Sequence, residues 1–201
     1  MMLPAAVERF LDALPEELRK DSVWNDLFEC LESYETLTDI SMIAMYNPEG
    51  KLNVSKIRYL LFTLEAHLNE FYILTERINV FLKRLERSYC KHPVHAHIKA
   101  AVERAKDNIK AEQERIRKAR GKHVHEKRYF DSGSDLRKMS LDRSRYGDDF
   151  TPPIRRQWKR IKVRELKKLR ARNHIAFRIF KFALVDINKV LLNKDGTMTR
   201  P

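Results

Sequence analysis

The sequence is poor in the residues that interrupt helices and in the residue that forms disulfides. Its 201 residues include only 5 glycines, 7 prolines and 2 cysteines. So few helix breakers, together with many Leu, Glu, Lys and Arg, favour helices over sheets. Five glycines also exclude the Gly-rich phosphate loops of P-loop and dinucleotide-binding proteins, and neither motif occurs. The composition therefore predicts an all-α protein without a nucleotide site of that kind.

Cys30 and Cys90 give no disulfide framework, because two isolated thiols carry no pattern of spacings. Each falls in an apolar helical pattern, so we expect two buried free thiols in a reducing compartment. The first residues show no basic region followed by an apolar run, as a signal peptide would. No apolar stretch reaches the roughly 18 residues that a membrane span needs. We therefore expect a cytoplasmic protein without a membrane partner.

The net charge of +13 is distributed unevenly along the chain. Residues 1–100 carry 12 Lys and Arg against 15 Asp and Glu, whereas residues 101–201 carry 29 against 13. A near-neutral half joined to a strongly basic half indicates a polyanionic partner, most often a nucleic acid. The alternative is a basic region that serves only solubility. Charge bears on partners and not on fold, and its asymmetry favours the polyanion.

Apolar residues recur at steps of three and four over most of the chain, as in amphipathic helices. They predict a short helix ending near Pro15 and a second beginning near Asp21 and Ser22. Long helices follow over 53–90, 92–120 and 152–193, with Pro93 in a first turn and Gly121 at a helix end. We expect a bundle of long antiparallel helices at 53–193, with helices at 1–46 packed on it. A basic loop at 131–153 and a flexible tail at 194–201 complete the predicted organisation.

One apolar stripe is long and uninterrupted, at 57–85. Its members alternate steps of three and four: Leu61, Leu64, Leu68, Phe71, Thr75, Ile78, Leu82 and Leu85. Such a stripe is typical of a bundle or coiled-coil face. A thin bundle would not bury all of it, so the pattern predicts a homodimer.

The predicted last helix changes character midway. Residues 154–172 hold ten Lys and Arg with one Glu, whereas residues 175–192 are mostly apolar. The distal half is therefore expected in the core and the proximal half in solvent or on phosphates. The nucleic-acid-binding candidates are Arg155, Arg156, Lys159 and Arg160. Trp158 lies at helical spacing, which favours a core position over a stacking platform.

Five of the seven histidines fall between residues 92 and 125. His92, His95 and His97 lie at one end of the predicted third helix and His123 and His125 at the other, about 40 Å away along the helix. Neither group has the Cys and His spacing of a structural zinc site, and no His-Glu-x-x-His motif occurs. We expect surface histidines, no metal and no cofactor.

The stretch "ARGKHVHEKRYFD", residues 119–131, offers the residues for metal-free RNA cleavage. Arg120 can hold a phosphate through two parallel hydrogen bonds, and His125 can exchange a proton near neutral pH. Lys122, Lys127 and Arg128 would raise the local phosphate concentration, and Tyr129 could stack on a base. The alternative is a charged helix end, since helix C-termini attract Lys, Arg and His through the dipole.

An all-helical chain with Arg120-Gly-Lys-His-Val-His125 near the end of a helix resembles the HEPN superfamily (higher eukaryotes and prokaryotes nucleotide-binding). The family's signature is Arg, four to six residues, then His. The resemblance implies a helical bundle, catalytic roles for Arg120 and His125, and a homodimer that joins two motifs in one site. Gly121 departs from the pattern where Asn is usual, and Lys127 stands where toxin members often have an aromatic. His123 is an extra imidazole that could substitute for His125.

The leading function from sequence is thus a metal-independent endoribonuclease that leaves 2′,3′-cyclic phosphate ends, in the role of a toxin or defence effector. Two alternatives stay open. One is a non-catalytic nucleic-acid-binding protein that uses the basic helix at 154–172. The other is a structural helical homodimer joined through the 57–85 face.

Overall fold

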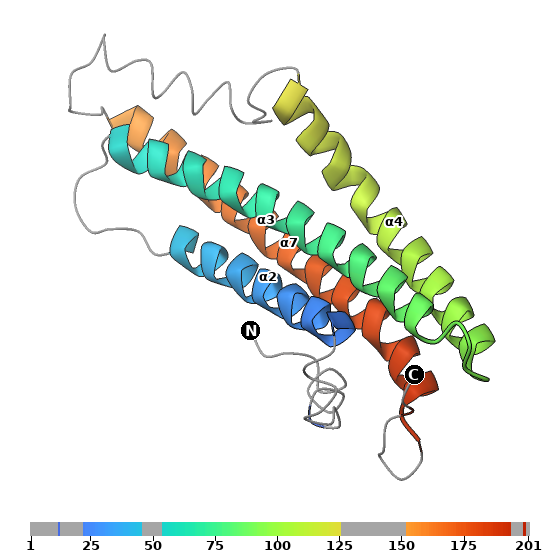
Figure 1. The fold of residues 1–201 in the computed structure, drawn as a ribbon. Helices are drawn as coiled ribbons and strands as arrows, with labels where there is room; N and C mark the ends of the chain where they lie inside the picture. The colour runs from blue at the N-terminus through green and yellow to red at the C-terminus, as the bar shows by residue number, and fades with distance from the viewer. Residues whose placement is uncertain (1–11, 13–21, 46–53, 126–151, 194–198, 200–201) are drawn as a thin grey trace. The chain divides into compact units, whose positions relative to one another are not determined.

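The structure is a computed structural model that describes residues 12, 22–45, 54–125, 152–193 and 199. Helices account for 92% of the described residues, and no strand occurs among them, so the predicted all-α fold is confirmed. Figure 1 shows the four long helices: α2 (Ser22–Met45), α3 (Val54–Ser88), α4 (His95–His125) and α7 (Pro152–Leu191). No helix in these ranges is both long and apolar enough to cross a membrane.

The predicted start of α2 and the predicted spans of α3 and α7 are confirmed to within two residues. Apart from residue 12, the short helix ending near Pro15 lies outside the described residues, as do residues 131–151 of the predicted loop and nearly all of the tail at 194–201. Residues 152 and 153, which were also assigned to the loop, begin α7. Because periodicity records which side of an element is buried, it locates long amphipathic helices well.

Both predicted ends of the third helix were wrong. The chain turns between α3 and α4, where the His92 N–H donates to Tyr89 O at 2.9 Å and the His95 N–H donates to His92 O at 2.9 Å. Pro93 lies in that turn, and α4 begins only at His95. The helix also continues through Gly121 to His125. A single glycine within a helix costs only about 1 kcal/mol, too little to end it by itself.

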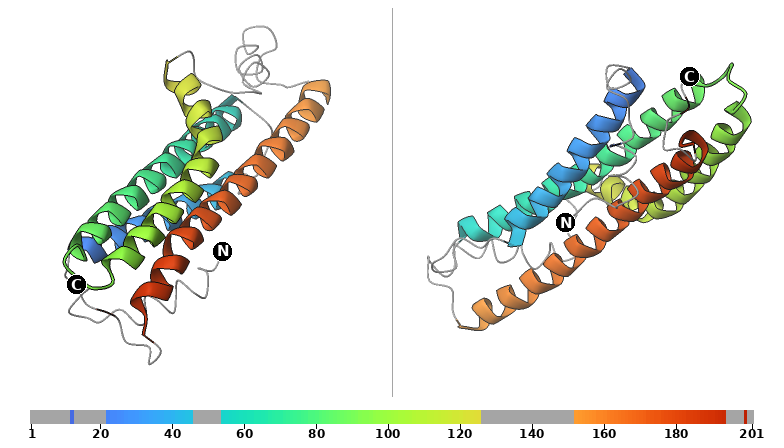
Figure 2. Two further views of the ribbon diagram at one scale, coloured as in Figure 1. Left: turned by 90° about the vertical axis from the view of Figure 1, so that its right-hand side faces the viewer. Right: turned by 90° about the horizontal axis from the view of Figure 1, so that it is seen from below.

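The chain divides into two compact units, each built from segments that are distant in sequence. Unit 1 comprises Met1–Glu35, Phe71–Glu114 and His174–Pro201, and unit 2 comprises Thr36–Glu70 and Arg115–Asn173. Each of the four helices contributes one part to each unit. Figure 2 shows the same helices from two further sides. The division of the chain expected between residues 46 and 53 stays a prediction.

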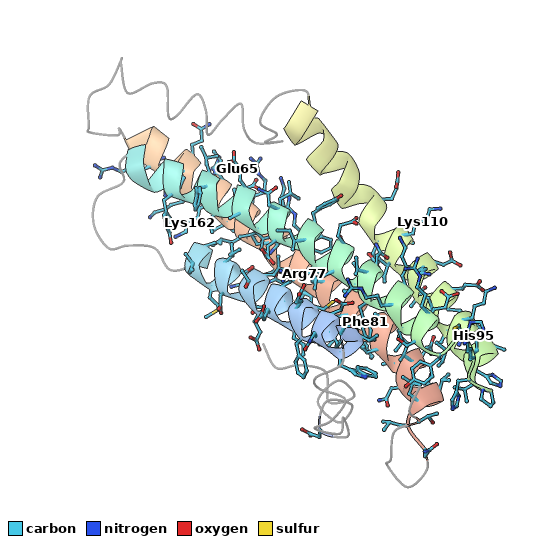
Figure 3. The ribbon with its side chains drawn as sticks, in the orientation of Figure 1. Glu65, Arg77, Phe81, His95, Lys110 and Lys162 are labelled. Atoms are coloured by element: carbon cyan, nitrogen blue, oxygen red, sulfur yellow. The ribbon has the colours of Figure 1, made fainter. Side chains whose placement is uncertain are left out.

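In unit 1, parts of all four helices pack around aromatic side chains. Trp24 of α2 lies 6.2 Å from Phe81 of α3 between ring centroids, and Tyr34 stacks on Phe180 of α7 at 5.7 Å (Figure 3 labels Phe81). Ion pairs border this core: Arg84–Asp26 at 2.6 Å joins α3 to α2. Arg104–Asp186, at 3.4 Å, joins α4 to α7. Aromatic rings from three helices thus lie within the core of this unit.

The apolar stripe of α3 is buried within the chain itself. Leu61 is half-buried, and the other seven members of the stripe are buried: Leu64, Leu68, Phe71, Thr75, Ile78, Leu82 and Leu85. The stripe therefore needs no second copy to cover it, which removes the physical ground for the expected homodimer. Dimerisation stays a prediction.

In unit 2, a smaller core joins α2, α3 and α7. Ala44, Leu60 and Leu64 pack with three residues of α7, namely Trp158, Ile161 and Leu169. A buried polar network lies in the same unit, linking His67, Asn173 and Ser41. The proximal half of α7 is thus anchored by one apolar stripe and one set of hydrogen bonds.

Candidate functional site

The buried stripe of α7 in unit 2 determines which of its residues face solvent. Trp158, Ile161, Glu165, Leu169 and Asn173 follow one another at steps of three and four, and all are buried. Trp158 is only 7% exposed and belongs to the core cluster. It is therefore a core residue, as expected, and is not available to stack on a base.

The solvent side of the same helix carries charge of one sign. Seven cationic residues are exposed: Arg155, Arg156, Lys159, Arg160, Arg164, Lys167 and Arg170. We call this set the basic face. The only acidic residue over 155–173 is Glu165, and it is buried. The four nucleic-acid-binding candidates of α7 thus lie on an exposed surface without an exposed acid from this stretch.

The basic face is hollowed along one side of the helix. An open depression of about 730 Å³, the basic hollow, is lined by seven residues of α7: Lys159, Arg160, Val163, Arg164, Lys167, Lys168 and Ala171. Five of them are cationic. The two remaining lining residues, Val163, which is 53% exposed, and Ala171, are apolar. An open depression lined by five cations suits a small anionic group, such as a phosphate, that fits between their side chains.

Glu165 divides the cations of the basic hollow into two groups. Its Oε1 accepts from Arg164 Nε at 3.3 Å and from Lys168 Nζ at 3.2 Å. The Glu165 side chain is 6% exposed, whereas those of Arg164 and Lys168 are 49% and 37% exposed. Lys159, Arg160 and Lys167 have no ion-pair partner within the described part of the chain. Two cations are thus fixed by a buried carboxylate, and three project without one.

The other polar group under this half of α7 is a directional hydrogen-bond chain. The Ser41 hydroxyl donates to Leu37 O at 3.2 Å, so Ser41 Oγ accepts from Asn173 Nδ2 at 2.8 Å. Asn173 Oδ1 then faces His67 Nε2 at 2.7 Å, and that nitrogen must carry the proton. Burial, helped by the positive charge of Arg172 and opposed by the hydrogen bond to Asn173, lowers the pKa of His67 from 6.5 to about 4. His67 is therefore neutral and braces α3, α7 and α2 against one another.

His67 is unsuited to proton exchange with a substrate. Its exposed fraction is 0%, and its Nδ1 has no hydrogen-bond partner among the described residues. A general base must reach the proton that it abstracts, and a fully enclosed imidazole cannot. We assign it a structural role.

Arg120, Lys122, His123 and His125 all lie in the last turns of α4, where the structure describes the backbone. On a continuous helix, positions 120 and 123 share a face, whereas positions 120 and 125 are about 140° apart around the axis. Lys127, Arg128 and Tyr129 lie outside the described residues. The expected catalytic roles thus remain predictions. The sequence placed the motif just beyond a helix that ends near Arg120, whereas in the structure the helix includes the whole motif and extends to His125.

Of the three histidines near the start of α4 that were expected at the surface, His97 is exposed, whereas His92 and His95 are half-buried. The His92 ring stands edge-on to that of Tyr89, at 5.8 Å between ring centroids. No group of three metal-ligating side chains occurs in the parts of the chain that the structure describes.

The two cysteines differ, contrary to the expectation that both are buried. Cys30 is buried among acidic neighbours, and burial, with Asp26, raises the pKa of its thiol to about 12. Cys90 is exposed, because it follows the buried Tyr89 beyond the end of α3, where the helical pattern no longer applies. Cys30 is consequently unreactive at neutral pH.

Sequence reasoning overlooked Glu165, Asn173 and His67. A signal existed for Glu165, since the only acid of a basic stretch falls at the spacing of the buried stripe. The same signal marks Asn173 four residues from Leu169, and His67 beside Leu64 and Leu68. What the sequence could not supply was the partner of each group on another helix.

Comparison with known proteins gives no relative from which a function could be taken. No protein-family model matches the chain, and no curated protein and no solved structure is significantly similar to it. The resemblance to HEPN proteins consequently rests on the Arg120–His125 motif and on helical content. The functional conclusions for this chain follow from its own residues.

Proposed function

We propose that the chain binds nucleic acid, RNA foremost, through the basic face of α7. The observation that carries this proposal is the exposed one-sign surface at 155–170, hollowed by the basic hollow and supported by a buried stripe. Guanidinium and ammonium groups gathered without exposed acids attract polyanions over several ångströms. A solvated helix face that served only solubility would not need five cations around one depression.

The hollow favours contacts with phosphates over contacts with bases. No aromatic side chain lines it among the described residues, and Trp158 is buried beneath. Base stacking, which supplies much of the affinity for unpaired bases, is therefore not provided at this surface. Binding through the backbone is tolerant of sequence and strongly salt-dependent.

Fluorescence anisotropy with a labelled RNA at several salt concentrations tests the proposal. Wild type should give a linear fall of log K with log salt, with a slope of about −0.7 to −0.9 for each phosphate contacted. Charge reversal at two exposed positions, Arg156→Glu with Lys159→Glu, should weaken binding and flatten the slope. A DNA of the same sequence indicates whether the sugar matters.

The matched control reverses two exposed cations elsewhere, Lys99→Glu with Lys110→Glu on α4. It changes the net charge by the same amount, so long-range attraction alone predicts the same loss for both pairs. The proposal predicts a much smaller loss for the α4 pair. Equal losses, or binding that ignores salt, would contradict a phosphate-binding surface on α7.

RNA cleavage at the Arg120 motif is the second candidate. It is supported by the residues themselves and by the grouping of Arg115–Asn173 in unit 2, so that the motif and the basic face belong to one compact unit. In this candidate Arg120 stabilises a phosphorane, and an imidazole removes the proton of a 2′-hydroxyl. Because positions 120 and 123 share a helix face, the one-chain form of this candidate pairs Arg120 with His123. In a two-copy form, His125 of one copy acts with Arg120 of the other.

Labelled RNA incubated in EDTA tests this candidate. Products should end in 2′,3′-cyclic phosphate, because the 2′-hydroxyl attacks its own phosphorus, and DNA should survive. Arg120→Ala should lower the rate by about 10²–10⁴, and one of His123→Ala and His125→Ala should match it. Loss of activity in EDTA, or cleavage of DNA, would rule the candidate out, and a monomer in light scattering would exclude the two-copy form.

A further inference from the structure

Arg164 lines the basic hollow and, unlike Lys159, Arg160 and Lys167, is held by a carboxylate of the described chain. It contacts the buried Glu165 through Nε, at 3.3 Å, and neither of its Nη nitrogens has a partner within the described part of the chain. A guanidinium held at Nε keeps its outer edge, Nη1 and Nη2, for a second ligand. Two parallel N–H groups on that edge match two oxygens of a phosphate.

Glu165 can affect anion binding in two opposite ways. Its negative charge partly neutralises Arg164 and Lys168, which would weaken binding. Its contacts also fix those long side chains before any ligand arrives, which removes part of the entropy cost of binding. Because the carboxylate is 6% exposed, leaving it unpaired would be costly, so it holds its two cations whether or not a ligand is present.

We infer that Arg164 is the phosphate anchor of the basic hollow and that Glu165 is its positioning residue, a refinement that rests on the proposed binding of nucleic acid. The outer edge of Arg164 takes one phosphate of the backbone bidentately. Lys159, Arg160 and Lys167 then act as unfixed charges along the flanking phosphates. The ligand class is a nucleic-acid phosphodiester backbone, read without contacts to bases.

Replacing arginine by lysine separates geometry from charge. Arg164→Lys keeps the charge and loses the planar edge, so affinity should fall about tenfold, as for one lost charge-assisted hydrogen bond, while the salt slope stays unchanged. Arg160→Lys is the matched control in the same hollow, one helical turn earlier and without a carboxylate partner among the described residues. It should change affinity less than twofold. Equal affinities for the two lysine variants would overturn the inference.

Substitution of Glu165 tests the positioning role by its sign. Glu165→Gln removes a negative charge from the hollow, so charge alone predicts tighter RNA binding and a steeper salt slope. Positioning predicts weaker binding, because a neutral amide holds the guanidinium less firmly. Glu165→Asp keeps the charge but shortens the reach, and it should also weaken binding. Tighter binding by Glu165→Gln would overturn the positioning role.

The double variant Arg164→Lys with Glu165→Gln shows whether Glu165 acts through Arg164. Its affinity should equal that of Arg164→Lys alone, whereas independent effects would add. Circular dichroism establishes that each variant is folded, and if Glu165→Gln is not, the two lysine variants decide alone. Wild type that fails to bind RNA refutes the proposed function itself. Wild type that binds, with Arg164→Lys unchanged, refutes only this inference.

Discussion

The proximal half of α7, up to Asn173, and its distal half, from His174 onward, bury different kinds of side chain although they form one helix. In the distal half seven apolar residues are buried: Ala176, Ile179, Phe180, Ala183, Leu184, Ile187 and Leu191. In the proximal half three apolar residues, Trp158, Ile161 and Leu169, share the buried stripe with Glu165 and Asn173. Buried polar groups contribute less to stability than the apolar side chains that they replace. The proximal half thus buries fewer apolar side chains, and its buried Glu165 holds two exposed cations in place.

The cations differ between the halves as well. In the distal half Arg178 pairs with Glu112 at 2.7 Å, and Lys189 pairs with Asp186 at 3.3 Å. On the basic face Lys159, Arg160 and Lys167 have no such partner in the described chain. Arg178 thus joins α7 to α4 and Lys189 pairs within α7, whereas the three proximal cations stay open to a ligand.

The largest effect should come from truncating the distal core. Phe180→Ala removes a buried ring that stacks on Tyr34, so the free energy of unfolding should fall by about 3–5 kcal/mol. Phe182→Ala is the control, because Phe182 is 38% exposed and its truncation should cost clearly less, about 1–2 kcal/mol. Urea denaturation measures both. Similar losses for the two would show that the distal half is not the stabilising one.

Acid should weaken the proximal half through His67. Its pKa is lowered from 6.5 to about 4 in the folded chain, so the unfolded state takes up a proton first as the pH falls. The stability that neutral His67 contributes is complete above pH 6.5 and is lost between about pH 6.5 and 4, up to about 3 kcal/mol.

The difference in unfolding free energy between wild type and His67→Gln isolates this loss from the carboxylates, which titrate in both proteins. His174→Gln is the control, because His174 is exposed. Parallel pH profiles for wild type and His67→Gln would show that His67 is not buried as a neutral group.

Breaking the hydrogen-bond chain should have a moderate effect. Asn173→Ala leaves His67 Nε2–H without its acceptor, so we expect a loss of about 1–3 kcal/mol in the free energy of unfolding. Ser41→Ala should cost less, because Ser41 also bonds within its own helix, to Leu37 O. Thermal melts followed by circular dichroism rank the two. A larger loss for Ser41→Ala would reverse the assigned order of the chain.

The smallest effects should separate the cations of the two halves. Arg178→Gln should lower stability by about 0.5 kcal/mol and leave the affinity for RNA unchanged, since exposed ion pairs contribute little. Arg160→Gln should leave stability unchanged and weaken binding, with the salt slope reduced by about 0.7 to 0.9. Melting and anisotropy on both variants test the contrast. If both variants affect the same quantity, the division of α7 into a structural and a binding half fails.

The sequence by itself determined the helical class, the start of α2, the spans of α3 and α7 and the change of character within α7. These properties depend on local composition and on the spacing of apolar residues, which do not require knowledge of partners. The sequence also predicted correctly that Trp158 is a core residue among cations that face solvent. The ends of α4 escaped it, because Pro93 and Gly121 are signals whose effect depends on the energies of neighbouring turns.

Only the tertiary structure decided what each buried polar side chain meets. Glu165 is an acid in a basic stretch until its burial and its contacts with Arg164 and Lys168 make it a positioning group. Asn173 and His67 are separated by 106 positions, and no local pattern pairs them. The α3 stripe predicted a partner chain, and the fold covered it with the chain's own helices. Periodicity states that a face must be buried, whereas the packing of distant segments determines against what.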